Sequence, residues 1–168
     1  MGGIDFGLPW CQQWTRKQKF GLYDVEDGSP ARLEHRHRHL WNAVILNPSG
    51  FHVRFTAIDN CIGIYRANGE LERRCDCMLT YRRTMVLIEL KNKRESWQQD
   101  GLMQIEAVLL RMKRDNREFY DRFPRRRAIV ANAKHRIPLF QSSNLAQREY
   151  FMRRYRTRIQ FVSEILLD

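Results

Sequence analysis

The stretch Asp76-Cys-Met-Leu-Thr-Tyr-Arg-Arg-Thr-Met-Val-Leu-Ile-Glu89-Leu-Lys91 decides how this chain is expected to fold. Val86 to Ile88 run directly into Glu89, a pattern typical of a strand that is buried on both faces. Acidic and lysine side chains are almost never fully buried unless they are paired or bind an ion. The end of this strand is therefore expected to hold charged groups that need a partner.

The same stretch predicts a hairpin that turns between Tyr81 and Thr84. Counting outward from that turn, Asp76 falls opposite Glu89 on the neighbouring strand. Directly opposed side chains of an antiparallel pair have Cβ atoms about 4.5–5.5 Å apart, and like charges there are destabilising unless something offsets them. A divalent cation would offset them. Lys91 lies two positions beyond Glu89 and hence on the same face, because side chains alternate along a strand.

These residues resemble the signature of the PD-(D/E)XK phosphodiesterase superfamily, which includes many restriction enzymes, recombination nucleases and resolvases. That signature is an Asp followed further along the chain by Glu-X-Lys, and here it reads Asp76 and then Glu89-Leu90-Lys91. The Pro that precedes the Asp in the family is absent, because Cys75 stands in its place.

Two further residues extend the resemblance. A helix predicted from about Glu95 to Asn116 carries Gln104, which resembles the glutamine that nucleases of the exonuclease branch place after the Glu-X-Lys strand. A helix predicted from Pro30 to about Leu46, with Ser29 as its N-cap, carries Glu34. Glu34 matches the acid that many members supply from their first helix.

The order of predicted elements agrees with the core of this superfamily. An α/β, restriction-endonuclease-like fold is expected, in which helices flank a central mixed sheet of about four to five strands. The expected order is αβββαβ, followed by a C-terminal helix and strand. Besides the helices above, the predicted elements are strands over 51–58, 62–66, 71–81, 85–90 and 128–131, a helix over 144–154 and a strand over 159–166.

The length of 168 residues allows a single nuclease-like domain with a core of ordinary size. Residues 1–28, rich in Trp and other aromatics, are expected to form an N-terminal extension packed on that core. No secretory signal is seen, nor an apolar run of the ~18 residues that a membrane helix requires. A cytoplasmic protein that does not associate with membranes is therefore predicted. Its four cysteines lack zinc spacing and are expected to be reduced packing residues.

The net charge of +11 comes mostly from arginine and favours nucleic acid as the partner. The planar guanidinium forms paired hydrogen bonds with phosphate that lysine cannot form. A solvated basic surface that only keeps the protein soluble is the alternative for any single cluster. The expected nucleic-acid contacts are Lys93 and Arg94 beside the proposed site, together with Arg82, Arg83, Lys134 and Arg136.

The resemblance implies a metal-dependent nuclease that hydrolyses phosphodiester bonds, with DNA favoured over RNA. Asp76, Glu89 and the backbone carbonyl of Leu90 would hold Mg²⁺ or Mn²⁺, which prefer oxygen ligands. Lys91 would orient or help deprotonate the attacking water, Gln104 would position the water or the lysine, and Glu34 would be an auxiliary ligand. A role in mobile-element defence or DNA repair follows only by analogy with the fold.

Two other classes of function remain open at this stage. The chain could be a catalytically inactive nucleic-acid-binding module of the same fold, whose binding would not depend on metal. It could also be a basic structural or interaction protein in which Asp76 and Glu89 merely pair with arginines. The small size and the lack of a separate recognition domain indicate structure-directed cleavage, a homodimer or a protein partner that delivers the substrate, and the sequence does not choose among these.

Overall fold

The computed structural model describes residues 3–134 and 144–168, which form two β-sheets and three α-helices. The larger sheet has six strands in the order β1-β5-β6-β7-β8-β9. The pairs β1–β5, β5–β6 and β6–β7 are antiparallel, whereas the pairs β7–β8 and β8–β9 are parallel. The strands are β1 (Gln12–Thr15), β5 (Val53–Ala57), β6 (Cys77–Tyr81), β7 (Thr84–Lys91), β8 (Arg125–Asn132) and β9 (Thr157–Phe161).

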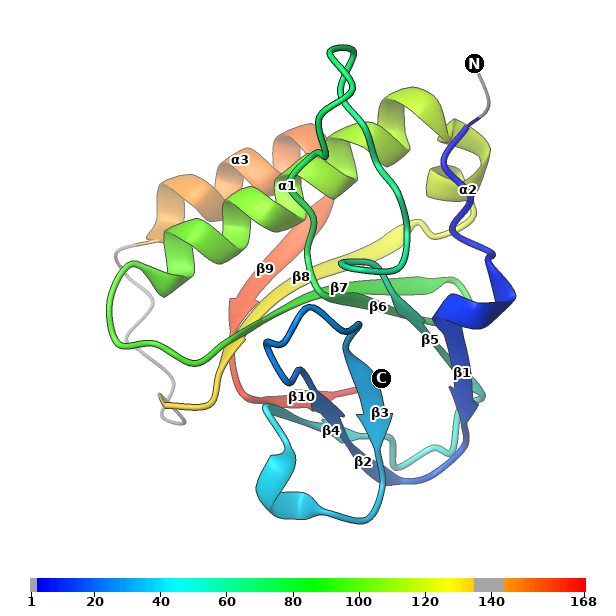
Figure 1. The fold of residues 1–168 in the computed structure, drawn as a ribbon, viewed down its shortest axis with the longest axis vertical. Coiled ribbons are helices and arrows are strands. Elements are labelled where there is room, and N and C mark those ends of the chain that lie inside the picture. The colour runs from blue at the N-terminus through cyan, green and yellow to red at the C-terminus, as the bar shows by residue number, and fades with distance from the viewer. Residues whose placement is uncertain (1–2, 135–143) are drawn as a thin grey trace.

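The smaller sheet has the order β10-β4-β2-β3 and covers one face of the larger one, while the helices lie over the other face (Figure 1). Its strands are β2 (Lys19–Tyr23), β3 (Arg32–Glu34), β4 (Ala43–Leu46) and β10 (Glu164–Leu166). The helices are α1 (Trp97–Asp115), α2 (Arg117–Asp121) and α3 (Leu145–Tyr155), with short 3-10 turns η1 (Pro9–Cys11) and η2 (Arg38–Leu40). The chain is therefore a mixed α/β protein in which two mixed sheets and a helical layer stack.

Strand β7 lies between the two hydrophobic cores, as its unbroken apolar run predicted. Met85 and Leu87 belong to the core under the helices, and Val86 and Ile88 belong to the core between the sheets. Because side chains alternate along a strand, Glu89 then falls on the helical side. The sequence of β7 thus determines which face receives its polar end.

The predicted register of the β6–β7 hairpin is confirmed. Tyr81 pairs with Thr84, and Cys77 pairs with Ile88 at the far end of the ladder. The turn of two residues is possible because Arg82 adopts a positive φ of 50°.

The predicted helix over residues 30–46 is wrong, since this segment forms β3, η2 and β4 of the smaller sheet. In β4, Ala43 and Ile45 are buried while Val44 and Leu46 are less so, which is the period of a strand. Pairing with β2 fixes this conformation. Gly21 of β2 leaves room for the Trp41 side chain, because a Cβ at position 21 would lie 2.1 Å from Cγ of Trp41.

The other predicted elements have mixed outcomes. The strands at β5, β7 and β8 and the helices α1 and α3 are confirmed, with ends shifted by up to three residues. The strand predicted over 71–81 is confirmed only over its second part, because β6 begins at Cys77. The strand predicted over 62–66 is wrong, because this loop holds only one isolated bridge, between Tyr65 and Leu71. The predicted C-terminal strand is divided between β9 and β10, which belong to different sheets. The N-terminal segment is part of both sheets, through β1 and β2.

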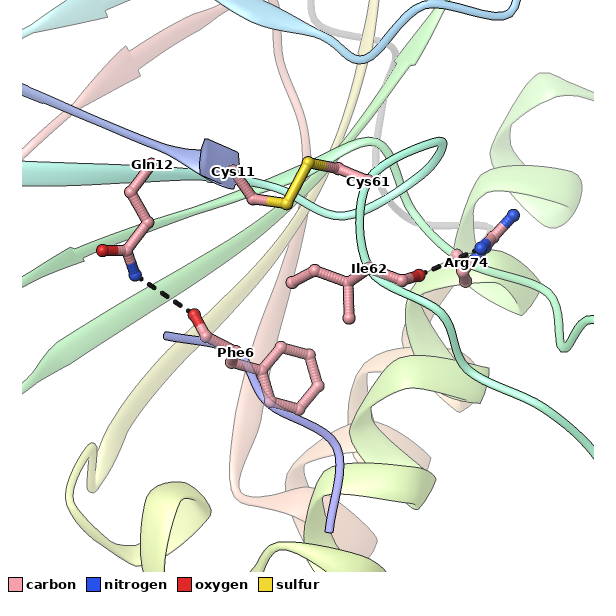
Figure 2. The surroundings of a disulfide bond; sticks show 6 residues. All are labelled: Phe6, Cys11, Gln12, Cys61, Ile62 and Arg74. Carbon is pink, nitrogen blue, oxygen red and sulfur yellow. Dashed lines mark hydrogen bonds between the residues drawn. A yellow bond between two sulfur atoms is a disulfide. The ribbon is translucent and has the colours of Figure 1, made fainter. Parts of the chain in front are cut away.

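The cysteine prediction holds for one pair and fails for the other. Cys75 and Cys77 are free and buried, as expected, whereas Cys11 and Cys61 form a disulfide (Figure 2). The pairing of β1 with β5 starts one residue after Cys11, and a turn after β5 returns Cys61 to meet it. Disulfides persist in oxidising compartments, so this one gives no support to the predicted cytoplasmic location.

Within residues 3–134 and 144–168, no helix is long and apolar enough to cross a membrane.

Candidate active site

Asp76 and Glu89 face each other where the β6–β7 ladder ends. The Asp76 backbone N–H donates to Oε2 of Glu89 over 3.2 Å, and the Leu90 N–H donates to Oδ2 of Asp76 over 2.6 Å. The two residues are only 6% and 3% exposed. Each carboxylate is thus held by the backbone of the opposite strand.

Burial raises the pKa of both carboxyl groups. The pKa of Glu89 rises from its ordinary value of 4.5 to about 7, although the positive charge of Lys91 acts to lower it. The pKa of Asp76 is raised well above its usual range by burial and then by the negative charge of Glu89, against the effect of the Leu90 N–H. Two buried carboxylates side by side are therefore unfavourable in their charged form unless a cation joins them.

Lys91 connects this acidic pair to helix α1. Its Nζ lies 2.8 Å from Oε1 of Glu89 and donates to Oε1 of Gln104 over 2.5 Å. The Gln104 amide in turn donates to the carbonyl of Arg74 over 3.2 Å. The lysine head group is therefore fixed between an acid on its own strand and an amide on the helix.

Helix α1 reaches this position because of a glycine. A Cβ at Gly101 would lie 2.5 Å from Cγ1 of Val130 on β8, closer than side chains pack. Gly101 therefore lets the first turns of α1 lie directly on the sheet. Gln104, almost one turn later, is thereby brought within reach of Lys91.

Lys91 and Gln104 line a cleft of about 410 Å³ between α1 and the loop that joins β5 to β6, whereas the buried Asp76 and Glu89 are not among its lining residues. Arg74 stiffens the loop wall, because it pairs with Asp59 over 2.9 Å and donates to the carbonyl of Ile62 over 3.0 Å (Figure 2). The lining residues are Asp59, Glu72, Arg73, Arg74, Lys91, Asp100 and Gln104.

Glu34 does not join the site. It lies on β3, where its carboxylate accepts hydrogen bonds from the backbone N–H groups of Arg36 and His37 over 2.9 and 3.0 Å. These hydrogen bonds lower the pKa of Glu34 to about 2. Since its predicted helix is absent, Glu34 is not presented to the cleft and instead closes a local turn.

Two acids that the sequence analysis did not select lie closer to the pair. The negative charges of Asp24, just after β2, and of Asp59, just after β5, both act to raise the pKa of Asp76. Asp59 begins a turn after β5. No spacing in the sequence links either acid to Asp76, because the fold alone brings the three segments together.

The predicted nucleic-acid contacts lie at both ends of the larger sheet. Lys93 pairs with Asp100 beside the cleft, and exposed Arg94 precedes α1. Lys134 is exposed just beyond β8, whose end lies beside that of β7.

Arg82 and Arg83 lie in the turn that begins β7, at the opposite end of that strand. Six residues separate Arg83 from Glu89, which corresponds to about 20 Å along the strand. The prediction for Arg136 falls outside the described residues.

The described residues contain no group of three or more His, Cys, Asp or Glu side chains arranged to hold a metal ion. A cation bound here would therefore depend on the two carboxylates, a backbone carbonyl and water. No protein-family model, curated protein or solved structure matches this chain. The site is distinguished by its own composition: two buried acids, a lysine and a glutamine at the edge of a cleft.

Proposed function

We propose that this protein is a metal-dependent nuclease with a PD-(D/E)XK, restriction-endonuclease-like core that hydrolyses phosphodiester bonds, DNA being favoured. The observation that carries the proposal is that Asp76, Glu89, Lys91 and Gln104 form one hydrogen-bonded cluster, of which Lys91 and Gln104 line the cleft. Asp76 directly precedes β6, Glu89 and Lys91 lie on β7, and Gln104 lies on α1. The sequence signature selected the first three, and the resemblance to nucleases of the exonuclease branch selected Gln104.

The order of elements supports the proposal. Strands β5, β6 and β7, helix α1 and strand β8 occur in the order βββαβ of the proposed core, with the short helix α2 inserted between α1 and β8. The smaller sheet stands where the first helix of that core was expected. The proposed similarity to the PD-(D/E)XK core is therefore limited to the segment from β5 to β8, which holds the site.

The donor set fits Mg²⁺ or Mn²⁺. Asp76 and Glu89 supply carboxylate oxygens, and the Leu90 N–H points toward Asp76. Because the N–H and C=O of one strand residue point to the same side, the Leu90 carbonyl is also directed toward that acid. When bound, such a cation would polarise a phosphate and lower the pKa of a water molecule.

The protein groups around this set have distinct tasks. Lys91 presents a positive charge to the cleft, where it would orient the attacking water and stabilise the charge that develops on the phosphate. Gln104 holds the lysine in that position through its 2.5 Å contact. Arg73 lines the same cleft without an ion pair to any described acid, and is placed to bind an adjacent phosphate.

A non-catalytic nucleic-acid-binding module is the second candidate. The observation that favours it is that Lys91 is already bonded to Glu89 and Gln104, so these polar groups have partners without a cation. The third class, a basic interaction protein, required the two carboxylates to pair with arginines. Within residues 3–134 and 144–168, neither Asp76 nor Glu89 bonds to an arginine.

The test is cleavage of circular and linear DNA, single- and double-stranded, and of RNA, with Mg²⁺, Mn²⁺ or EDTA. We expect metal-dependent cleavage that falls at least about 100-fold in Lys91→Ala and in Glu89→Gln, because each removes a group acting on the reaction. Glu72→Gln is the matched control, since Glu72 lines the same cleft but bonds to Arg66.

Full activity of folded Lys91→Ala would contradict the proposal. Salt-sensitive binding that is unchanged by EDTA, with no cleavage of any substrate, would support the non-catalytic module instead.

A further inference from the structure

Eight arginines gather at the end of the larger sheet that lies away from the cleft, near α2 in Figure 1. The pairing of β7 with β8 and of β8 with β9 sets the beginnings of these three strands side by side, and the β6–β7 turn adjoins them. We call this set the arginine end: Arg82 and Arg83 in the turn, Arg122 after α2, Arg125, Arg126 and Arg127 in β8, and Arg156 and Arg158 around the start of β9.

The described residues form no ion pair with the side chains of the arginine end, whereas five arginines elsewhere pair with an acid. Most of its members are exposed. Guanidinium groups gathered in this way repel one another and create a strongly positive local field. An anion with several charges would relieve that repulsion.

Five of these arginines line a cavity of about 410 Å³. Arg126 forms its fixed floor, because its guanidinium donates to the carbonyls of Tyr155, Tyr120 and Phe123 over 3.0, 3.1 and 2.6 Å. Arg127 is held by Gln160 and by the carbonyl of Leu166.

The rim of the cavity consists of Arg125, Arg156 and Arg158, which are exposed. Within the described part of the chain, no hydrogen bond or ion pair engages their side chains. Asp168 is the single acid among the lining residues. A floor of anchored arginines under a rim of unengaged ones suits phosphate groups, which guanidinium binds with paired hydrogen bonds.

An adjoining cavity favours a polynucleotide over an acidic protein. It has a volume of about 350 Å³ and shares Arg82 and Arg122 with the arginine end. Trp14 lines it with its side chain 48% exposed, and the Arg54 guanidinium lies 4.3 Å from the ring centre. An exposed aromatic ring beside arginines is the arrangement on which unpaired bases stack.

We propose that the arginine end is a second nucleic-acid-binding site, which holds the phosphodiester backbone and acts independently of the cleft. Thr84 borders its cavity and lies five residues before Glu89, which corresponds to about 17 Å along β7. A nucleic-acid duplex rises about 3.4 Å per base pair. The distance between the arginine end and the cleft therefore corresponds to about five base pairs of duplex. Binding here requires neither metal nor the Asp76–Glu89 pair.

The test measures affinity for a labelled single strand and for its duplex by fluorescence anisotropy, in EDTA and over a series of salt concentrations. The variant Arg125→Gln/Arg156→Gln/Arg158→Gln removes the rim. Each lost phosphate contact lowers the slope of log K against log salt by about 0.9 on duplex DNA. We therefore expect the slope to fall by about two to three, while the melting temperature stays unchanged.

The matched control is Arg16→Gln/Arg36→Gln/Arg38→Gln, which removes the same charge from exposed positions around the smaller sheet. It should leave the slope nearly unchanged. An unchanged slope in the rim variant, or equal falls in both triple variants, would overturn the proposal. If the triple variant does not fold, Arg158→Gln alone should lower the slope by about one, and no change would likewise overturn it.

Glu89→Gln separates this inference from the proposed function. It should bind as the parent protein does, since the arginine end is intact. If the parent cleaves nothing while the rim variant loses salt-sensitive binding, the nuclease proposal fails and the second site stands.

Discussion

At the scale of single residues, the most informative feature is that two acids are buried together at the end of an apolar hairpin. Asp76 and Glu89 each accept a backbone hydrogen bond, yet burial still raises the pKa of both. Such a pair lowers the stability of the metal-free fold once it ionises. A cation bound between the acids would remove that cost, which couples metal binding to stability.

This coupling predicts the pH dependence of stability. The folded-state pKa of Glu89 lies near 7, above its ordinary value of 4.5. Between pH 4.5 and pH 7 the folded protein therefore binds more protons than the unfolded chain does. The free energy of unfolding should therefore fall as pH rises through this window, by about 3 kcal/mol from Glu89 alone. Urea unfolding in EDTA at pH 5 and pH 8 measures this fall, which should be smaller in Glu89→Gln.

Added Mg²⁺ should restore stability to the parent at pH 8 and do little for Glu89→Gln. Glu72→Gln is the control, because hydrogen bonds to Arg73 and Arg66 lower the pKa of Glu72 and give it the opposite pH dependence. If the free energy of unfolding depended on pH in the same way in the parent and in Glu89→Gln, Glu89 would not be the group whose raised pKa causes this dependence.

The same scale shows what sequence could predict about the site. Asp76, Glu89 and Lys91 are brought together by hairpin register and strand alternation, which are local rules. Gln104 was selected by the resemblance to nucleases of the exonuclease branch, and its contact with Lys91 depends on how α1 packs. Asp24 and the Cys11–Cys61 pair depend on segments that only the complete fold brings together. No periodicity of one segment carries that information.

At the scale of elements, the wrong helix over 30–46 shows where local pattern fails. Leu33, Leu40 and Val44 have helical spacing, but Ala43 and Ile45 also alternate as in a strand. The partner β2 decides between the two, because its pairing with β4 buries the alternating set. Long elements such as β7 and α1 were predictable because their own patterns are unambiguous.

The contact between α1 and β8 predicts the effect of Gly101→Ala. Alanine favours a helix by about 0.8–1.0 kcal/mol over glycine, but the new Cβ would meet Val130 at 2.5 Å. Overpacking costs about 1–3 kcal/mol, so a net loss of about 1 kcal/mol in the free energy of unfolding is expected. Because α1 must shift, cleavage should also fall through the displaced Gln104.

Chemical denaturation and cleavage rates of Gly101→Ala measure these two effects. Leu110→Ala is the comparison, since Leu110 is 37% exposed on the same helix and lies six positions beyond Gln104. A stabilised and fully active Gly101→Ala protein would contradict the requirement for close packing.

At the scale of the whole molecule, the described chain has a polar cleft at one end of the larger sheet and the arginine end at the other. The cleft is bounded by the loop between β5 and β6, which lacks regular secondary structure beyond one bridge. The connections that hold this loop include the Arg74–Asp59 ion pair and the hydrogen bond from Gln104 to the carbonyl of Arg74. The Cys11–Cys61 disulfide ties the loop to the N-terminal segment (Figure 2). The N-terminal segment therefore contributes to the shape of the cleft without lining it.

The disulfide is thus expected to support both stability and cleavage. Cross-links across separations such as these 50 residues contribute about 2–4 kcal/mol, so reductant should lower the melting temperature and the cleavage rate of the parent together. Cys11→Ser/Cys61→Ser should show the lower values with or without reductant. Cys75→Ala/Cys77→Ala should keep the parent's sensitivity, because these thiols are buried and free. If reductant lowered the melting temperature but left cleavage unchanged, the disulfide would stabilise the fold without shaping the cleft.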